Sequence, residues 1–254
     1  MNPGRKNIFI LNFVLLVVML GYGMVMPVMP FFIEKLGAGG QELGWLISTY
    51  SLMQLICAPL WGMLSDRIGR KPVIAFGVLG YAVTLFLFGI ATEFWMLFLA
   101  RTFSGILSSA TMPTSLAYIA DNAPPGERSA GMGQLGAATG AGIVAGPLMG
   151  GLLSAQSLSL PFFVGAGLAG ISFLLVLFLL PESRHPPAVI GEGKQTSLLN
   201  IRRLVFSPAG MLLLLIFITS FGLANFQGII GLYAVDKFKC TTGQVGMLWM
   251  VKIV

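Results

Sequence analysis

Charged residues are scarce in this sequence. Asp, Glu, Lys and Arg make up 9% of its 254 residues, whereas an ordinary soluble domain carries about 25%. Hydrophobic residues make up 56%, and they gather in runs long enough to cross roughly 30 Å of hydrocarbon as helices. No stretch is left over for a separate soluble domain. The composition therefore predicts an all-α membrane protein.

Histidine and cysteine are also nearly absent, which excludes several kinds of chemistry. The two cysteines, Cys57 and Cys240, lack the spacing of a metal site or a redox pair. The single histidine, His185, falls in a predicted linker, so it cannot assist a serine nucleophile inside the membrane. A phosphate-binding G-x-x-x-x-G-K-[ST] loop is missing from the sequence. We therefore expect neither an enzyme nor an ATP-driven motor, and no metal site.

An excess of basic residues gives the chain a net charge of +6. In a soluble protein this charge would suggest nucleic acid, but bases that flank apolar runs more simply set the orientation of a membrane protein. We predict a multi-pass protein of the cell membrane with a cytoplasmic N-terminus and no nucleic-acid partner. In this orientation the bases of the inner side are Arg5, Lys6, Arg67, Arg70, Lys71, Arg128, Arg184, Lys194, Arg202 and Arg203, and those outside are Lys35, Lys237 and Lys239.

Apolar runs and their breaks divide the chain into three parts. Residues 1–181 predict a six-helix bundle, residues 182–207 a cytoplasmic linker, and residues 208–254 the start of a second bundle. An eighth apolar run begins near residue 244 with about half of the length needed to cross, so we expect a truncated chain. The complete spans are predicted at residues 8–32, 43–64, 72–92, 94–120, 130–153, 160–181 and 209–234.

The turn between the second and third spans reads "GMLSDRIGRKP", residues 62–72. An orientation signal would explain its bases, but not its acid or its glycines. The turn resembles the signature of the major facilitator superfamily, G-x-L-x-D-R-x-G-R-K. The resemblance implies a major facilitator-type six-helix N-terminal bundle, followed by one complete and one partial helix of the C-terminal bundle. The matching residues are Gly62, Leu64, Asp66, Arg67, Gly69, Arg70 and Lys71.

In that family, the resemblance implies, this turn forms a gating loop. Asp66 is expected against a helix N-terminus of the opposite half, where a carboxylate is favoured. Arg70 is expected to pair with an acid at the cytoplasmic end of span 4, because a guanidinium holds a carboxylate through two parallel hydrogen bonds. Asp121 is the acid in that place. The helix that Asp66 should meet is expected beyond Val254.

Span 5 carries "GQLGAATGAGIVAGPLMGG", residues 133–151. Its glycines recur at small-xxx-small spacing, which lets helix backbones approach closely, and packing alone would account for them. The segment also resembles the antiporter motif of drug-exporting members of the superfamily. There the motif is taken to kink the span and to seal the outer half, which favours export over uptake. The matching residues are Gly142, Gly146, Pro147, Gly150 and Gly151.

Arg101 falls about seven residues into span 4. A charge at the centre of a span costs about 2.5 to 3.5 kcal/mol on insertion scales, so an intramembrane base is a functional candidate by default. The alternative is a side chain that reaches back to the outer interface. With Gly105, Arg101 resembles the span 4 motif of drug/proton antiporters, where the arginine is linked to proton coupling. Ser104, Ser108 and Thr111 follow at helical spacing and form a candidate polar stripe.

Candidate substrate contacts come from spans 1, 2 and 7. The end of span 1 resembles another element of the drug exporters, and flexible methionine and aromatic side chains suit varied apolar ligands. Span 7 resembles the same span of Gram-positive multidrug exporters close to the quinolone-efflux pumps. Several of those carry an acid where this chain has Gln227, which cannot carry a proton, so we expect the titrating acid in the second half. The candidates are Tyr22, Met26, Gln54, Asn225 and Gln227, with Met19 beside them.

The sequence thus predicts a secondary active transporter that exports small amphipathic compounds or drugs. The resemblance implies proton antiport by alternating access, with a substrate site near the midplane, a proton gradient as the energy source and no cofactor. The expected partners are a small-molecule substrate and the lipid bilayer, and the expected state is a monomer. Two alternatives stay open: a metabolite uptake transporter of the same fold, and an inactive or regulatory truncated membrane fragment.

Overall fold

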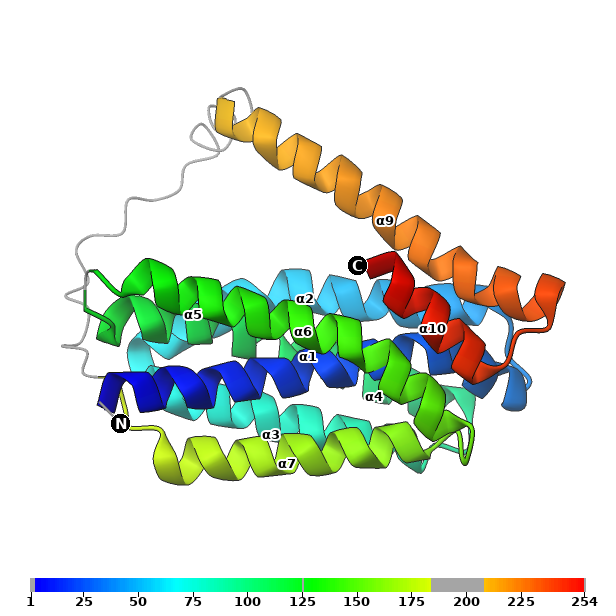
Figure 1. The fold of residues 1–254 in the computed structure, drawn as a ribbon, viewed down its shortest axis with the longest axis horizontal. Helices are drawn as coiled ribbons and strands as arrows, with labels where there is room; N and C mark the ends of the chain where they lie inside the picture. The colour runs from blue at the N-terminus through cyan, green and yellow to red at the C-terminus, as the bar shows by residue number, and fades with distance from the viewer. Residues whose placement is uncertain (1–2, 125, 184–207, 254) are drawn as a thin grey trace.

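The computed structural model describes residues 3–124, 126–183 and 208–253, and over these ranges its regular structure is helical throughout (Figure 1). The all-α fold predicted from the sequence is confirmed. Most of the predicted linker, from residue 184 to residue 207, lies outside the described residues. The helices are α1 (Pro3–Lys35), α2 (Gly40–Ile68), α3 (Arg70–Gly89), α4 (Phe94–Ser108), α5 (Thr111–Asn122), α6 (Arg128–Ser154), α7 (Leu160–Leu179), α9 (Pro208–Phe238) and α10 (Thr242–Ile253).

Helix α1 runs through the middle of a bundle formed by α1 to α7. It packs on α6 and α7, while α3 packs on α7 and α4, and α2 on α4. Leu11, Val14 and Leu15 of α1 are fully buried. Large apolar side chains such as Leu55 and Phe178 are about three-quarters exposed, at 73% and 75%, which fits a surface in contact with lipid. Five helices, α1, α2, α3, α6 and α7, are long and apolar enough to cross a membrane.

The predicted fourth span is not one helix. Its residues form α4 and α5, which meet at a break over Ser109 and Ala110. Pro113 explains the break, because proline has no N–H for the carbonyl four residues earlier, that of Ser109, and its ring presses on that carbonyl. The Ala110 N–H bonds instead to the Leu107 carbonyl, at 3.3 Å, in a tighter turn.

The break leaves the carbonyl of Ile106 without its usual helical donor. Two side chains take over: the indole N–H of Trp61 in α2 donates to it at 2.7 Å, and the Ser109 hydroxyl also donates to it at 2.7 Å. In lipid, where water cannot satisfy a freed carbonyl, such replacement donors are what make a proline break tolerable. The hydrogen bond from Trp61 therefore stabilises the break and joins α4 to α2.

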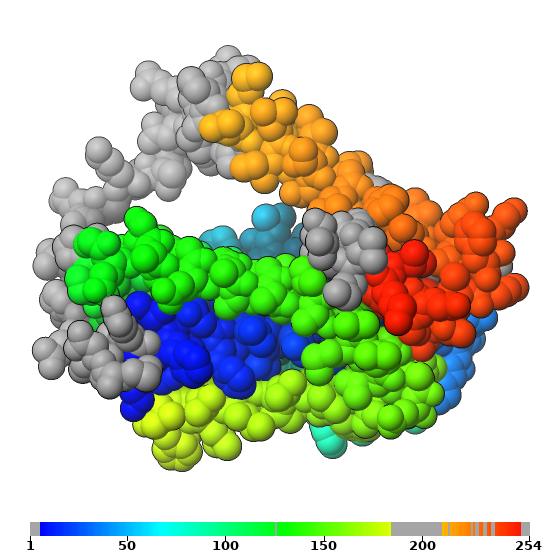
Figure 2. Space-filling model, viewed as in Figure 1, coloured from blue at the N-terminus to red at the C-terminus, as the bar shows by residue number. Residues whose placement is uncertain are grey.

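Helices α9 and α10 lie outside this bundle. We call the end of the bundle that carries the N-terminus and Arg70 the Arg70 end, and the opposite end the Glu34 end. Helix α10 packs mainly on α6 near the Glu34 end. Helix α9 meets α1 and α2 at the Glu34 end and stands away from α6 toward the Arg70 end (Figures 1 and 2). At the Arg70 end, α9 is therefore separated from the bundle.

Candidate functional site

The first candidate site is a cluster of charges at the Arg70 end. Arg70, the first residue of α3, is only 7% exposed. Its Nε donates to Oδ2 of Asp121 at 3.0 Å, its Nη2 lies 2.5 Å from Oδ1 of Asp66, and its Nη1 donates to the Ser65 hydroxyl at 2.5 Å. One guanidinium therefore joins the end of α2, the start of α3 and the end of α5. The ion pair between Arg70 and Asp121 that the family resemblance implied is present, and Asp66 joins it from one turn before.

Gly69 makes the sharp turn that brings α2 and α3 together at this cluster. Its φ is +101°, in the left-handed region that side-chain-bearing residues rarely adopt. A Cβ at this position would lie 2.7 Å from Oε1 of Glu182, which follows α7. The same oxygen accepts the backbone N–H of Lys71 at 3.2 Å, and a carboxylate at a helix N-terminus is favourable. Glu182 is thus part of the cluster, although the sequence pattern did not single it out.

The other residues of the gating motif are less enclosed. Arg67 is exposed, and the side chain of Asp66 is 51% exposed in spite of its contact with Arg70. A Cβ added to Gly62 would meet no atom of the described residues within 4 Å. The exposed residues of the motif, Asp66 and Arg67, thus lie on the surface of α2, whereas Arg70 is enclosed.

The four glycines of the antiporter motif in span 5 lie in two helix crossings. A Cβ on Gly142, Gly146 or Gly150 would lie 2.5 to 2.6 Å from a backbone carbonyl oxygen of α1, closer than real Cβ atoms approach. Helix α6 is continuous from Arg128 to Ser154 in spite of Pro147. These glycines are therefore needed for backbone contact between α1 and α6.

Gly151 faces a different helix. A Cβ there would lie 2.8 Å from the Thr242 carbonyl oxygen, and one on Gly246 would lie 2.5 Å from the carbonyl oxygen of Pro147. Small residues on both helices thus allow α10 to lie directly on α6, in the close crossing that small-xxx-small patterns permit. The crossing lies near the Glu34 end, where α10 reaches the bundle (Figure 1).

The second candidate site surrounds Arg101 in α4. Arg101 is 3% exposed, so its side chain does not reach back to an interface. Its guanidinium lies 4.1 Å from the centre of the Tyr50 ring and 6.0 Å from that of Tyr22. The two rings stack on each other with centroids 5.8 Å apart. The Tyr50 hydroxyl lies 3.2 Å from that of Ser108 and accepts a hydrogen bond from the Gln54 amide at 2.9 Å.

A cavity of about 300 Å³ lies on the other side of these rings. It is mostly apolar, with a small polar group formed by the tyrosines, Gln54 and Ser108. Such a pocket, apolar with few polar groups, is typical of small-molecule sites. Its walls are Val18, Met19, Tyr22, Tyr50, Gln54, Ala58, Ser108, Ser109, Met112 and Pro113.

The predicted substrate contacts fall in different places. Tyr22 and Gln54, together with Met19, line the cavity. Met26 does not: it packs against a separate cluster that includes Trp249 of α10, because it is one turn farther along α1. Asn225 and Gln227 belong to α9, and their side chains lie outside the described residues.

Tyr50 was missed by the sequence reasoning. Its neighbours in the sequence, "STYSLMQ", give only a weak signal: a tyrosine one helical turn before Gln54, on the same face of a span. The contacts of Tyr50 with Arg101 and Ser108 join residues about fifty positions apart, which no local pattern displays.

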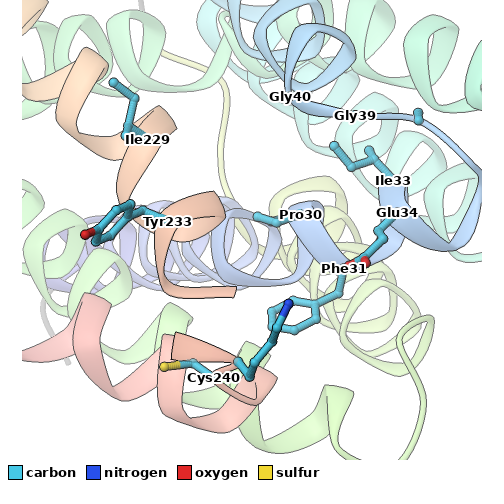
Figure 3. Close-up of a pocket in the computed structure, with 11 residues that line it drawn as sticks. Pro30, Phe31, Ile33, Glu34, Gly39, Gly40, Ile229, Tyr233 and Cys240 are labelled. Atoms are coloured by element: carbon cyan, nitrogen blue, oxygen red, sulfur yellow. The ribbon is translucent and has the colours of Figure 1, made fainter. Parts of the chain in front are cut away.

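A larger pocket, of about 640 Å³, lies at the Glu34 end. Figure 3 shows Pro30, Phe31 and Glu34 of α1 on one side of it and Ile229 and Tyr233 of α9 on the other. It occupies the seam where α9 and the segment before α10 meet the bundle. Its position at the end of the helices separates it from Arg101 and the cavity in the middle of the bundle.

Together, the long apolar helices, the glycine crossings and the mostly apolar cavity are typical of a multi-pass membrane protein. The sequence profile of the Major Facilitator Superfamily matches residues 11–254. The chain therefore belongs to the Major Facilitator Superfamily.

Known proteins similar to the chain are bacterial resistance proteins. It is 35% identical to multidrug resistance protein 1 of Bacillus subtilis over 248 residues, which are 96% of this chain and 63% of that protein. It is 31% identical to the quinolone resistance protein NorA of Staphylococcus aureus over 234 residues, 92% of this chain and 60% of that protein. The chain thus spans about three-fifths of the length of these relatives.

A solved structure agrees with the fold. A bacterial homologue of the human lysosomal transporter Spinster, in an inward-facing and unoccupied conformation, superposes with a TM-score of 0.79 at 17% sequence identity. The match covers 99% of this chain and 60% of the other. At this identity the likeness concerns the fold alone.

Proposed function

We propose that the protein is a secondary active transporter that exports small amphipathic compounds by proton antiport and alternating access. The observation that carries this proposal is the cavity in the middle of the bundle, with an aromatic and methionine-containing wall, a few polar groups and a buried arginine behind it. Such a wall suits varied apolar ligands, because methionine and aromatic side chains adapt their contacts. The similarity to two drug-resistance proteins supports export as the direction.

In this proposal the Arg70 end faces the cytoplasm and the protein lies in the cell membrane as a monomer. The basic residues at that end, including Arg67, Arg70 and Lys71, support this orientation through the preference of bases for the cytoplasmic side. The separation of α9 from the bundle at the Arg70 end (Figure 2) supports a state in which this end is the open one. The α6–α10 crossing at the Glu34 end holds the outer side closed, which is the role the antiporter motif has in the proposal.

The Arg70 cluster acts in the proposal as the inner gate. Its buried part ties three helix ends of one bundle together, and the exposed part of Asp66 is available to a helix N-terminus of the second bundle, where its charge is favoured. Breaking and forming that contact would accompany the rocking of one bundle against the other. The internal pairs keep the ends rigid during this motion.

A proton gradient is the proposed source of energy. Among the described side chains, the acids lie at helix ends and in turns; the proposal places the proton carrier in the second bundle. Arg101 is the proposed coupling residue of this bundle, since a buried cation favours the ionised form of a nearby acid. The proposed partners are a small-molecule substrate and the bilayer.

The experiment is an efflux assay in cells that express the protein from its native gene. Asp66→Asn should abolish export of a fluorescent amphipathic dye, while the amount of protein in the membrane stays unchanged. Glu93→Gln is the matched control, because it removes one carboxylate from the turn before α4, at the Glu34 end. Equal efflux in the two variants would contradict the gating role, and an unchanged dye level in wild-type and empty cells would contradict export.

A further inference from the structure

Arg101 carries a positive charge that no described side chain neutralises. The guanidinium forms no ion pair or hydrogen bond within the described residues, and its Nε is sealed from solvent without a partner. Its nearest described partner is the face of Tyr50. An aromatic face compensates a buried charge only in part, since a buried ion needs both a countercharge and hydrogen bonds to offset lost hydration. An acceptor with negative charge is therefore missing at this place.

The surroundings of Arg101 supply further donors and no acid. The Tyr81 hydroxyl is also buried without a hydrogen-bond partner among the described residues, and it lies against Gly21, the residue before Tyr22: a Cβ on Gly21 would be 2.7 Å from it. No Asp or Glu is found among the described residues that line the neighbouring cavity. The site therefore favours an anion over a cation.

Tyr22 and Tyr50 line the cavity, and the rings of both lie next to the guanidinium of Arg101. Tyr50 is fixed in this wall of the cavity by Ser108 and Gln54. Tyr22 is half-buried, and the contacts described for its ring are the stacking on Tyr50 and the longer approach to Arg101. Stacking contributes less free energy than a hydrogen bond to a charged group. An anionic head group that displaced the Tyr22 ring and bound Arg101 would therefore form a stronger interaction than the stacking it replaced. Tyr22 is thus the movable side of the wall.

We infer that Arg101 is a substrate subsite that binds the carboxylate of an aromatic, amphipathic compound, which enters from the cavity past Tyr22. The ring system of the compound would lie in the cavity against Met19 and Met112, and its carboxylate would take up the free donors of Arg101. This inference rests on the proposed transport function and specifies one class of substrate for it.

The test compares three compounds in inside-out vesicles that contain the protein expressed from its native gene. They are a fluorescent aromatic carboxylate, its neutral carboxamide and a cationic amphipathic dye. The wild-type protein should transport the carboxylate with a lower KM than the carboxamide. In binding to the purified protein in detergent, Arg101→Gln should raise the Kd of the carboxylate about tenfold or more, as loss of a hydrogen bond to a charged group does. It should change the Kd of the carboxamide by less than about twofold on the same basis. Arg101→Lys, which keeps the charge, should restore part of the preference.

Each outcome bears on the inference. Binding of the carboxamide by Arg101→Gln with the affinity of the wild type shows that this variant folds. A Kd of the carboxylate that Arg101→Gln leaves unchanged, or raises no more than that of the carboxamide, would overturn the subsite. Transport of the cationic dye alone by the wild type would overturn the subsite while the proposed function stands. A wild type that transports none of the three would contradict the proposed function itself.

Discussion

Gly146 holds α6 against α1, and its replacement by alanine tests the backbone crossing. A Cβ there would lie 2.6 Å from the Leu20 carbonyl oxygen and 2.7 Å from the Cα of Gly23. Contacts under 3.0 Å are essentially never seen for real Cβ atoms, and the atoms in the way are backbone, which cannot rotate aside. The two helices must therefore separate by several tenths of an ångström along their central crossing.

Gly140→Ala is the matched control, because a Cβ on Gly140 meets no described atom within 4 Å. Both substitutions gain the same helix propensity, up to about 1 kcal/mol. Their difference then isolates the overpacking penalty, which is typically about 1 to 3 kcal/mol. Gly146→Ala should be less stable than Gly140→Ala by this amount.

The assay is equilibrium unfolding of the purified protein in detergent by increasing fractions of SDS, followed by circular dichroism. Gly146→Ala should unfold at a lower SDS fraction than the wild type, and Gly140→Ala at the same fraction or a higher one. If the two alanine variants unfold at the same SDS fraction, Gly146 is not needed for close backbone contact between α1 and α6.

Three further predictions concern the charge cluster and the helix break. Asp121→Asn should lower the free energy of unfolding by about 1.5 to 3 kcal/mol in the same SDS assay, as loss of a hydrogen bond between charged groups does. Wild-type stability of this variant would contradict the ion pair between Arg70 and Asp121. Gly69→Ala should cost about 1 to 3 kcal/mol, because it forces a positive φ on alanine, and wild-type stability would refute the strained turn. Trp61→Phe should cost about 0.5 to 1.5 kcal/mol through the lost donor to the Ile106 carbonyl, and a neutral result would mean that the Ser109 hydroxyl alone satisfies the carbonyl.

The helices were largely predictable from the sequence. Runs of apolar residues mark the spans because the bilayer sets their length, and the predicted ends fall within a few residues of those observed, as for residues 160–181 and α7 (Leu160–Leu179). The break at Ser109 was not predicted, although the proline that causes it, Pro113, stands in the sequence of the span. A proline in a span is tolerated with or without a break, and the outcome depends on whether a neighbour such as Trp61 supplies the missing donor.

The candidate sites were predictable only where the residues carry a recognisable motif. Arg70, Asp121 and the span 5 glycines belong to patterns of fixed spacing. The structure pairs Arg70 with Asp121 as expected, whereas the helices that the glycines contact were not predicted. Tyr50 and Glu182 reach their partners across the fold. Hydropathy does not mark such residues in a membrane protein, because the faces toward lipid and toward the bundle are both apolar. The roles assigned to all of these residues in gating and coupling remain predictions.

The central claim is that the protein exports its substrate in exchange for protons. Its most direct test is substrate accumulation in inside-out vesicles containing the protein expressed from its native gene, with an acidic lumen and a neutral outside. If the protein is a proton antiporter, an amphipathic substrate accumulates in the lumen, and a protonophore, which removes the gradient, abolishes the accumulation. Accumulation that the protonophore leaves unchanged would contradict proton antiport. Accumulation only in right-side-out vesicles would contradict export and identify an uptake transporter.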